Sequence, residues 1–415
     1  MSDSRNPQRS WRLALAYTDF RNYQLARLLT GFSQAMQSVA VGWQVYEITK
    51  RPMDLGLVGL AQFLPGVALF LISGHVADRF DRRRLYGVCC GGFAVCSGLL
   101  VMLIPRANHS VYPIYVVLVL VGVVRSFSWP AGQALLPQLI PAEDFPSGVA
   151  LGATVTQTAM ILGPALGGVV YALSRGPGAV YGTAAVASLG AMIATMRIRT
   201  RVKPRAPEQV SLGTVLAGLR YIWKQRLILG TISLDLFAVL LGGAVALLPV
   251  YAREILSTGP WGLGLLRSAP GVGAAAMAFL MAHRPLRGRA GATMLWCVAG
   301  FGFFTILFGI SRNFVLSLVA LLLVGATDMV SLIIRSTMVQ LATRDEMRGR
   351  VGAVNMLFIG ASNELGEFES GVTAAWFGTV PAVVLGGVGT LVVAAVWAWK
   401  FPEIRQSDRL SGPAD

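Results

Sequence analysis

The feature that most constrains the fold of this chain is a series of twelve apolar stretches, each long enough to cross a bilayer as a helix. About 20 helical residues span the roughly 30 Å of hydrocarbon in a membrane. Only 13% of the residues are charged and 54% are hydrophobic, a composition too apolar for a soluble globular protein. We therefore expect an all-α membrane protein with six spans in each half of the chain. The expected spans are residues 22–48, 55–78, 85–105, 111–137, 147–173, 178–197, 227–252, 261–283, 291–311, 314–342, 351–378 and 379–400.

The net charge of +15 is explained by where the basic residues lie. With twelve spans, 25 of the 35 lysines and arginines fall on one side of the membrane. The positive-inside rule then places both termini and the long central loop in the cytoplasm. Because the basic residues are spread over separate loops, no nucleic-acid partner is expected. The N-terminal stretch is polar and its first apolar span exceeds a signal peptide, so it should stay attached, as in a multi-pass protein of a bacterial inner membrane.

The chain also repeats itself over about half its length. Leu118–Ser128 returns as Leu321–Ser331, and Pro65–Val67 returns as Pro270–Val272, at offsets of 203 and 205 residues. Such repeats in membrane proteins form two similar bundles with a binding site at their interface. We expect an N-terminal six-helix bundle (1–199), a cytoplasmic linker (200–225) and a C-terminal six-helix bundle (226–415).

The linker has apolar residues at three- and four-residue intervals after Ser211, with basic residues between them. This pattern predicts an amphipathic helix on the cytoplasmic face of the membrane. A simple extension of the seventh span is an equally good interpretation.

A loop motif lies between the second and third spans, from Gly74 to Arg84, and reads GHVADRFDRRR. It resembles the G-x-L-A-D-R-x-G-R-R/K signature of the major facilitator superfamily, with Asp81 in place of the second glycine. We expect the loop to act as a conformational latch, with Gly74 allowing close helix approach and charged residues at the membrane boundary. The latch candidates are Gly74, Asp78, Arg79 and Arg82. The second half carries a weaker copy, in which His283 stands at the position of Asp78.

A second motif lies in the fifth span: Gly163, Pro164, Gly167 and Gly168 form a G-P-x-x-G-G pattern. It resembles the motif associated with exporters of the same superfamily, notably drug/proton antiporters. Over its whole length the chain is similar to the branch of enterobactin-exporter-like and macrolide-efflux-like permeases. The resemblance implies two pseudo-symmetric six-helix bundles and transport by alternating access, commonly as a monomer. We expect the small residues of this motif to let the helix contact a partner in the other half.

Nine ionisable residues fall inside the predicted spans, where each costs roughly 2.5 to 3.5 kcal/mol at the helix centre and is a functional candidate. They are Arg27, Arg125, Asp235, Arg267, Asp328, Arg335, Glu364, Glu367 and Glu369.

Some of these residues suggest specific roles in transport. Arg125 and Asp328 occupy equivalent positions in the two repeats and are the strongest candidate pair. Buried carboxylates can load and release protons, so Asp235 and Glu367 are proton-coupling candidates, with Arg125 and Arg267 as counter-charges or anion-binding groups. The alternative is a set of static buried pairs that fix helix register.

Helical geometry separates the three glutamates into two groups and determines which of them are candidates for substrate binding or coupling. Glu364 and Glu367 share a helix face, whereas Glu369 is rotated by about 180° from Glu367. The substrate and coupling candidates are therefore Arg125, Asp328, Asp235, Glu367, Glu364, Arg267 and Arg27.

The sequence favours a secondary active transporter that exports a small amphipathic molecule, siderophore-like or drug-like, in exchange for protons. Import of a metabolite or lysophospholipid remains an alternative, as does a receptor or scaffold that transports nothing. No P-loop, H-E-x-x-H or G-x-S-x-G elbow is present, so no enzyme activity is expected. The cysteines have no metal-like spacing, and neither a metal nor a cofactor is expected.

Overall fold

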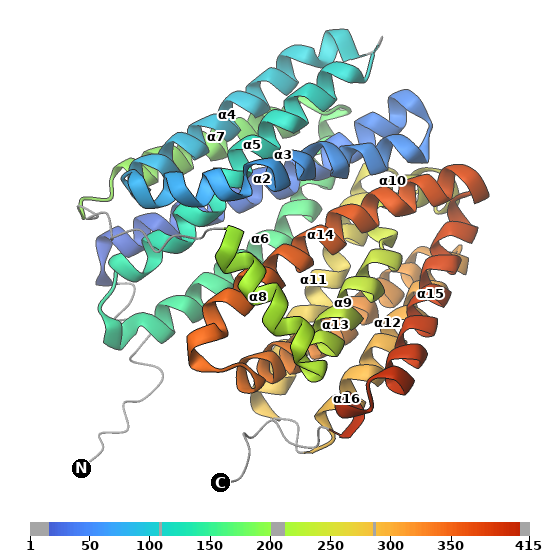
Figure 1. The fold of residues 1–415 in the computed structure, drawn as a ribbon. Coiled ribbons are helices and arrows are strands. Elements are labelled where there is room, and N and C mark those ends of the chain that lie inside the picture. Colours follow the sequence, from blue (N-terminus) through green and yellow to red (C-terminus); the bar gives the residue numbers. More distant parts are fainter. Residues whose placement is uncertain (1–15, 108–109, 201–211, 285–287, 407–415) are drawn as a thin grey trace. The chain divides into compact units, whose positions relative to one another are not determined.

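The computed structural model describes residues 16–107, 110–200, 212–284 and 288–406, and these ranges contain helices and no strand (Figure 1). The long helices of the first half are α2 (Thr18–Thr49), α3 (Pro52–Arg79), α4 (Arg82–Ala107), α5 (Tyr112–Leu135), α6 (Phe145–Ser174) and α7 (Gly178–Met196). The helices that follow, long and short, are α8 (Leu212–Lys224), α9 (Arg226–Leu241), α10 (Leu248–Val250), α11 (Gly259–His283), α12 (Ala290–Ile310), α13 (Phe314–Ala342), α14 (Asp345–Phe377), α15 (Thr379–Lys400) and α16 (Pro402–Gln406). The remaining described elements are the 3₁₀ helices η1 (Leu136–Gln138), η2 (Ala142–Asp144) and η3 (Ala244–Leu247) and the π-helix η4 (Tyr251–Ile255).

Ten helical segments of the described chain are long and apolar enough to cross a membrane. One of them, Arg226–Ile255, runs from α9 through η4 as a broken helix. The two other predicted spans correspond to α2 and α14, which are long but carry more polar and charged residues. The predicted all-α membrane fold is thus confirmed, and ten of the twelve predicted spans are among these segments.

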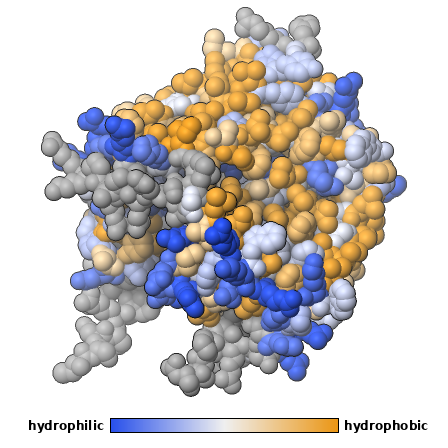
Figure 2. Space-filling model, viewed as in Figure 1, coloured by the Kyte–Doolittle hydropathy of each residue, from blue (hydrophilic) through white to orange (hydrophobic). Residues whose placement is uncertain are grey.

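The surface fits a chain embedded in lipid. Figure 2 shows hydrophobic residues over much of the visible face. Large apolar side chains such as Trp399, Leu173 and Trp296 are about four-fifths exposed, at 82%, 80% and 78%. A soluble monomer does not tolerate so much exposed apolar surface, whereas a bilayer covers it.

By contacts, the chain divides into two units. Unit 1 comprises residues 1–44 and 61–209, and unit 2 comprises residues 45–60 and 210–415. The end of α2 and the start of α3 are therefore grouped with the second half of the chain.

Unit 1 is held by α4, which packs against both α5 and α7. Aromatic and aliphatic side chains of four helices form its core, with Phe20, Tyr23, Tyr86 and Leu135 all nearly inaccessible. The Tyr23 hydroxyl donates a hydrogen bond of 2.6 Å to the carbonyl oxygen of Gly132, so its polar end is satisfied inside the core. This core fixes α2 against α5.

Unit 2 repeats the neighbour relations of unit 1, because α12 packs against both α13 and α15. Matching glycines allow two close helix crossings. A Cβ at Gly122 of α5 would collide with the backbone of Gln62, and one at Gly325 of α13 would collide with the backbone of Pro270. These two glycines are 203 residues apart, so the sequence repeat preserves a helix crossing as well as apolar character.

The segment before α9 contains α8, which packs against α14 and α9. Gln225 has an extended backbone and separates α8 from α9. Ile222 is buried among residues of α9, α13 and α14, whereas Leu216 and Trp223 are exposed. Ser211, which precedes this apolar pattern in the sequence, lies outside the described residues. The helix is thus distinct from the following span and keeps part of its apolar surface uncovered.

Candidate functional site

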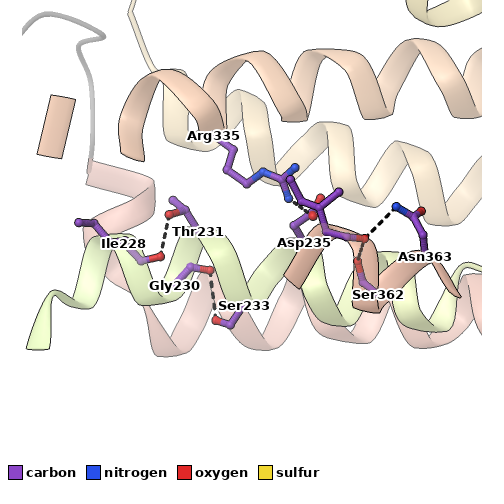
Figure 3. A network of polar contacts seen from close by, with 9 residues as sticks. Ile228, Gly230, Thr231, Ser233, Asp235, Arg335, Ser362 and Asn363 are labelled. Atoms are coloured by element: carbon purple, nitrogen blue, oxygen red, sulfur yellow. Dashed lines mark hydrogen bonds and ion pairs between the residues drawn. The ribbon is translucent and has the colours of Figure 1, made fainter. Parts of the chain in front are cut away.

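Two deeply buried charges of unit 2, Asp235 of α9 and Arg335 of α13, form an ion pair (Figure 3). The two residues are only 8% and 3% exposed. A carboxylate and a guanidinium shielded to this degree need each other, since either alone would be an uncompensated charge in a low-dielectric environment. The pair joins two helices that are about 100 residues apart in sequence.

Polar side chains beside this pair satisfy their own helices. On α14, Ser362 Oγ and Asn363 Nδ2 donate to the carbonyl oxygen of Ile359 at 3.0 and 2.9 Å. On α9, Thr231 Oγ1 donates to the carbonyl oxygen of Ile228 at 3.0 Å (Figure 3). Hydroxyls that return to the backbone in this way stay compatible with an apolar environment.

Sequence reasoning placed Arg335 inside a span but gave it no role. A count of residues from the helix ends places the two charges at similar depth but does not select the pair. Asp235 lies nine residues from the start of α9 and Arg335 seven residues before the end of α13, so both lie about 10–14 Å from a helix end. Both of these helix ends are predicted to be cytoplasmic.

A second group of charges in unit 2 comprises Arg267 of α11 and two glutamates of α14. The Arg267 guanidinium interacts electrostatically with the carboxylates of Glu367 and Glu364. All three side chains are partly buried. The third glutamate, Glu369, instead accepts a hydrogen bond of 2.7 Å from Thr373 of its own helix. The structure therefore separates Glu369 from the other two, as the helical rotation predicts.

Glu367 also lies against the start of α3. A Cβ at Gly59 would lie 2.8 Å from Glu367 Oε2, and a Cβ at Gly56 would lie 3.0 Å from the carbonyl oxygen of Phe368. Gly371 of α14 in turn faces the Gly56 backbone at 2.9 Å. The absence of side chains at these glycines lets the two helices approach closely around a carboxylate.

Arg125 and Asp328, the candidate pair from the repeat, lie on α5 and α13. Arg125 is exposed in unit 1, and Asp328 is partly buried in unit 2. Within the described residues Asp328 makes no hydrogen bond or ion pair. It thus differs from Asp235, whose charge is already compensated.

In unit 1, Arg27 of α2 reaches α6. Its Nη2 donates to Thr156 Oγ1 at 2.8 Å, and its guanidinium carbon lies 5.7 Å from the centre of the Tyr23 ring. The side chain is partly buried. A hydroxyl and an aromatic face orient this cation without neutralising it.

Sequence reasoning missed a group of charges at the ends of the first and seventh spans. The Tyr46 hydroxyl donates to Glu254, and Arg253 forms an ion pair with Glu47 at 3.2 Å. These contacts connect the end of α2 to η4, both within unit 2. The sequence signal available here is that Tyr46 and Tyr251 are 205 residues apart, the offset at which Pro65–Val67 returns.

The loop motif is built around Asp81 and Arg82. Asp81 Oδ1 accepts from the backbone N–H groups of Arg83 and Arg84 at 2.9 and 3.2 Å, so it caps α4 where the superfamily signature has glycine. Arg82 is 7% exposed and donates to the carbonyl oxygen of Ala134 at 3.3 Å. The first latch loop is therefore tied to α5.

The remaining latch candidates fit less closely. Arg79 is exposed, and the side chain of Asp78 lies outside the described residues. The expectation of close helix approach at Gly74 needs correction, because a Cβ there would meet nothing within 4 Å among the described residues. In the second copy His283 is exposed and stacks on Phe279 with ring centres 4.3 Å apart.

The glycine motif of α6 also needs a correction. A Cβ at Gly163 would lie 2.5 Å from the Ala35 Cβ, and one at Gly167 would lie 2.9 Å from the Met36 Cα. These contacts are with α2 of the same unit, whereas we expected a helix of the other half. Pro164 and Gly168 are buried. Within the described ranges, no cluster of three His, Cys, Asp or Glu side chains could hold a metal ion.

Two helical units of apolar spans, with charged groups held inside them, define a multi-pass integral membrane protein of the transporter class. Comparison with known proteins specifies the class further. The family model MFS_3, described as "Transmembrane secretion effector", matches residues 12–413. The chain belongs to this family of the major facilitator superfamily. It is therefore a membrane transporter of a small-molecule substrate and not an enzyme.

Curated relatives match along nearly the whole chain. The enterobactin exporter EntS of Shigella boydii serotype 4 is 26% identical over 411 residues, covering 96% of each protein. The enterobactin exporter EntS of Escherichia fergusonii gives the same identity and coverage.

Solved structures share the fold at low sequence identity. A bacterial homologue of the human lysosomal transporter Spinster superposes with a TM-score of 0.74 at 12% identity, covering 94% of this chain and 98% of that one. The nucleoside transporter NupG gives a TM-score of 0.66 at 15% identity, covering 94% of this chain and 99% of that one.

Proposed function

We propose that this protein is a proton-coupled exporter of a small amphipathic molecule, siderophore-like or drug-like, that works by alternating access. The observation that carries the export assignment is the full-length similarity to enterobactin exporters. The G-P-x-x-G-G pattern at Gly163–Gly168, typical of exporters, supports the same direction. The charged groups inside the apolar helices support coupling to an ion.

The coupling proposal rests on two acid–base groups of unit 2. In one, Glu367 interacts electrostatically with Arg267 and lies in the tight contact with α3. In the other, Asp235 is paired with Arg335. Protonation of either carboxylate would release its arginine and change the electrostatic attraction between two helices. Glu364 shares a helix face with Glu367 and belongs to the first group.

The substrate-binding residues and the two bundles are proposed from the repeat. Arg125 and Asp328 stand at equivalent positions of the two halves, and we propose that both contribute to binding the transported molecule. We propose residues 1–199 and 226–415 as the two bundles. Residues 200–225 would link the bundles on the cytoplasmic side of a bacterial inner membrane, with both termini cytoplasmic and the monomer as the working unit.

Export is tested in a strain that lacks the gene. Cells are loaded with a fluorescent drug or siderophore, and retention is followed with and without an uncoupler. Export predicts higher retention in the deletion strain, and an uncoupler should raise retention in the wild type to the same level. Lower content on deletion would indicate import, and no difference for any compound would indicate a receptor or scaffold.

Coupling is tested with Glu367→Gln and Asp235→Asn, with Glu369→Gln as the matched control because Glu369 bonds within its own helix. Transport by the control should keep its dependence on the proton gradient, whereas at least one of the two test variants should lose it. Unchanged proton dependence in both test variants would remove the coupling proposal. Melting temperatures of the purified variants separate loss of coupling from loss of folding.

A further inference from the structure

Arg27 differs from Arg335 and Arg267, two arginines of membrane helices that interact with carboxylates. Arg335 is paired with Asp235, and Arg267 interacts electrostatically with two glutamates. Arg27 makes no ion pair with any carboxylate of the described residues; its partners there are the Thr156 hydroxyl and the Tyr23 ring. A guanidinium does not lose its proton in a protein. Arg27 is therefore a partly buried cation inside an apolar span, and the described residues supply no anion to pair with it.

The neighbouring side chain of Gln24 is also incomplete. Gln24 is 5% exposed, and neither its Nε2 nor its Oε1 has a hydrogen-bond partner among the described residues. Leaving a buried amide unsatisfied costs about 1–3 kcal/mol. A polar group held at such a cost next to an unpaired cation is well placed to bind a ligand.

Both side chains converge on one glycine of α6. A Cβ at Gly152 would lie 2.5 Å from Arg27 Nη1 and 3.4 Å from Gln24 Nε2. Any other residue at this position would push the guanidinium and the amide aside. Thr156, one turn further along α6, accepts from Arg27 while donating to the carbonyl oxygen of Gly152 at 3.0 Å. The Thr156 hydroxyl thus positions Arg27.

The arginine is positioned from its other side as well. Tyr23 lies one turn before Arg27 on α2 and is 1% exposed, with its hydroxyl held by the backbone of Gly132. Because this ring cannot move freely, the guanidinium above it keeps one orientation. The guanidinium N–H donors of Arg27 are thus held in place, and among the described residues only some of them have an acceptor.

We propose that Gln24, Arg27, Gly152 and Thr156 form an oxyanion subsite, which binds a carboxylate or phenolate oxygen of the transported molecule. This inference rests on the proposed transport function and assigns its substrate an acidic group. Arginine offers two parallel N–H donors, which match the two oxygens of a carboxylate, and the Gln24 amide supplies a third donor. An anionic lipid headgroup has the same chemistry and is the competing source of the anion.

Two dyes that differ in one group test the subsite. Rhodamine 110 carries a carboxylate, and rhodamine 123 is its methyl ester. Binding of each to detergent-purified full-length protein is measured by fluorescence anisotropy. The wild type should prefer the acid. Arg27→Gln should weaken binding of the acid about tenfold, as expected for a lost charge-assisted hydrogen bond, and should leave the ester nearly unchanged.

Two further variants complete the test. Arg21→Gln makes the same change on the exposed surface of α2, where the Arg21 guanidinium donates to Thr18 Oγ1 at 3.4 Å and forms no ion pair with the described residues, and should bind both dyes like the wild type. Gln24→Leu should weaken binding of the acid several-fold. It should also raise the melting temperature of the ligand-free protein, because it removes an unsatisfied amide. A purely structural Gln24 would lose stability instead.

The subsite is refuted if the wild type binds both dyes equally or binds neither, or if Arg27→Gln weakens both dyes to the same extent. Nanodiscs of phosphatidylcholine with and without phosphatidylglycerol test the lipid source. Loss of the acid preference only with phosphatidylglycerol would assign the anion to a headgroup and overturn the substrate assignment.

Transport of both dyes into proteoliposomes separates this inference from the proposed function. Proton-driven transport without an acid preference in binding removes the subsite and leaves the exporter. An acid preference that depends on Arg27, without transport of either dye, leaves the subsite and counts against the exporter.

Discussion

The buried pair of Asp235 and Arg335 should behave differently from an exposed pair when one partner is removed. Its side chains are 10% and 4% exposed, so Asp235→Asn leaves an arginine charge with almost no water to solvate it. Breaking a buried pair from one side costs about 3–5 kcal/mol. Arg335→Gln should cost a similar amount, because it leaves the carboxylate alone.

This loss is large enough to measure as a melting temperature. Unfolding entropy is roughly 2.1 cal/mol/K per residue, so a unit of roughly 200 residues loses about 10 °C for a destabilisation of about 4 kcal/mol. The assay is thermal unfolding of detergent-purified variants. The control is Asp345→Asn at the pair of Arg348 and Asp345, which is 2.9 Å long but 52% and 85% exposed. That change should cost less than about 1 kcal/mol.

The double variant Asp235→Leu with Arg335→Met tests whether the stability lost in the single variants comes from an uncompensated buried charge. Replacing both charges by apolar groups of similar volume should recover most of the stability that either single change loses. A double variant as unstable as the worse single variant, or single changes no larger than the exposed control, would refute the reasoning that buried charge dominates here.

Two other predictions concern unit 1. Gly167→Ala should lower stability by about 1–3 kcal/mol because the new Cβ meets Met36, whereas Gly74→Ala should be nearly neutral because a Cβ there meets no described atom within 4 Å; equal melting temperatures would contradict the α2–α6 contact. Burial raises the pKa of Asp19, which precedes the apolar span 22–48, but hydrogen bonds from Thr200 and its neighbour lower that pKa overall, below the ordinary 3.8. Its contribution to stability is therefore present above pH 3.8 and is lost as the pH falls through the lower folded pKa. Asp19→Asn should melt below the wild type at pH 6, with the gap closing as the pH falls below 3.8 and through the lower folded pKa; a gap independent of pH would contradict this assignment.

The helical fold, the repeat and the depth of each charged residue could be predicted from the sequence, because hydropathy and period determine them. The rotation of each helix about its own axis could not. Because the rotations are not known from the sequence, several arginines could have paired with Asp235, and the sequence indicated no preference for Arg335. The same gap explains the correction at Gly163 and Gly167, since a run of small residues favours a close contact but does not select the neighbouring helix.

Local chemistry was predictable only where it follows a known signature. Asp81 departs from the superfamily motif, and its role as a helix cap is clear only once the backbone of Arg83 and Arg84 is placed. The contacts of Glu47 and Glu254 lie at helix ends, where charged residues are common and carry little signal. The unsatisfied amide of Gln24 has no sequence signature, because burial of one side chain depends on every neighbour.

The grouping of residues 45–60 with the second half has a practical consequence for dividing the protein into two polypeptides. A break near residue 210 would leave the C-terminal fragment without the glycine-rich start of α3 that lies against Gly371 and Glu367. Such a fragment, expressed alone, would expose the surface of α14 around Glu367 and Gly371 that α3 otherwise covers, and it should fold poorly. Co-expression of both fragments would restore the missing helix segment in trans, so complementation of two inactive halves is the expected behaviour.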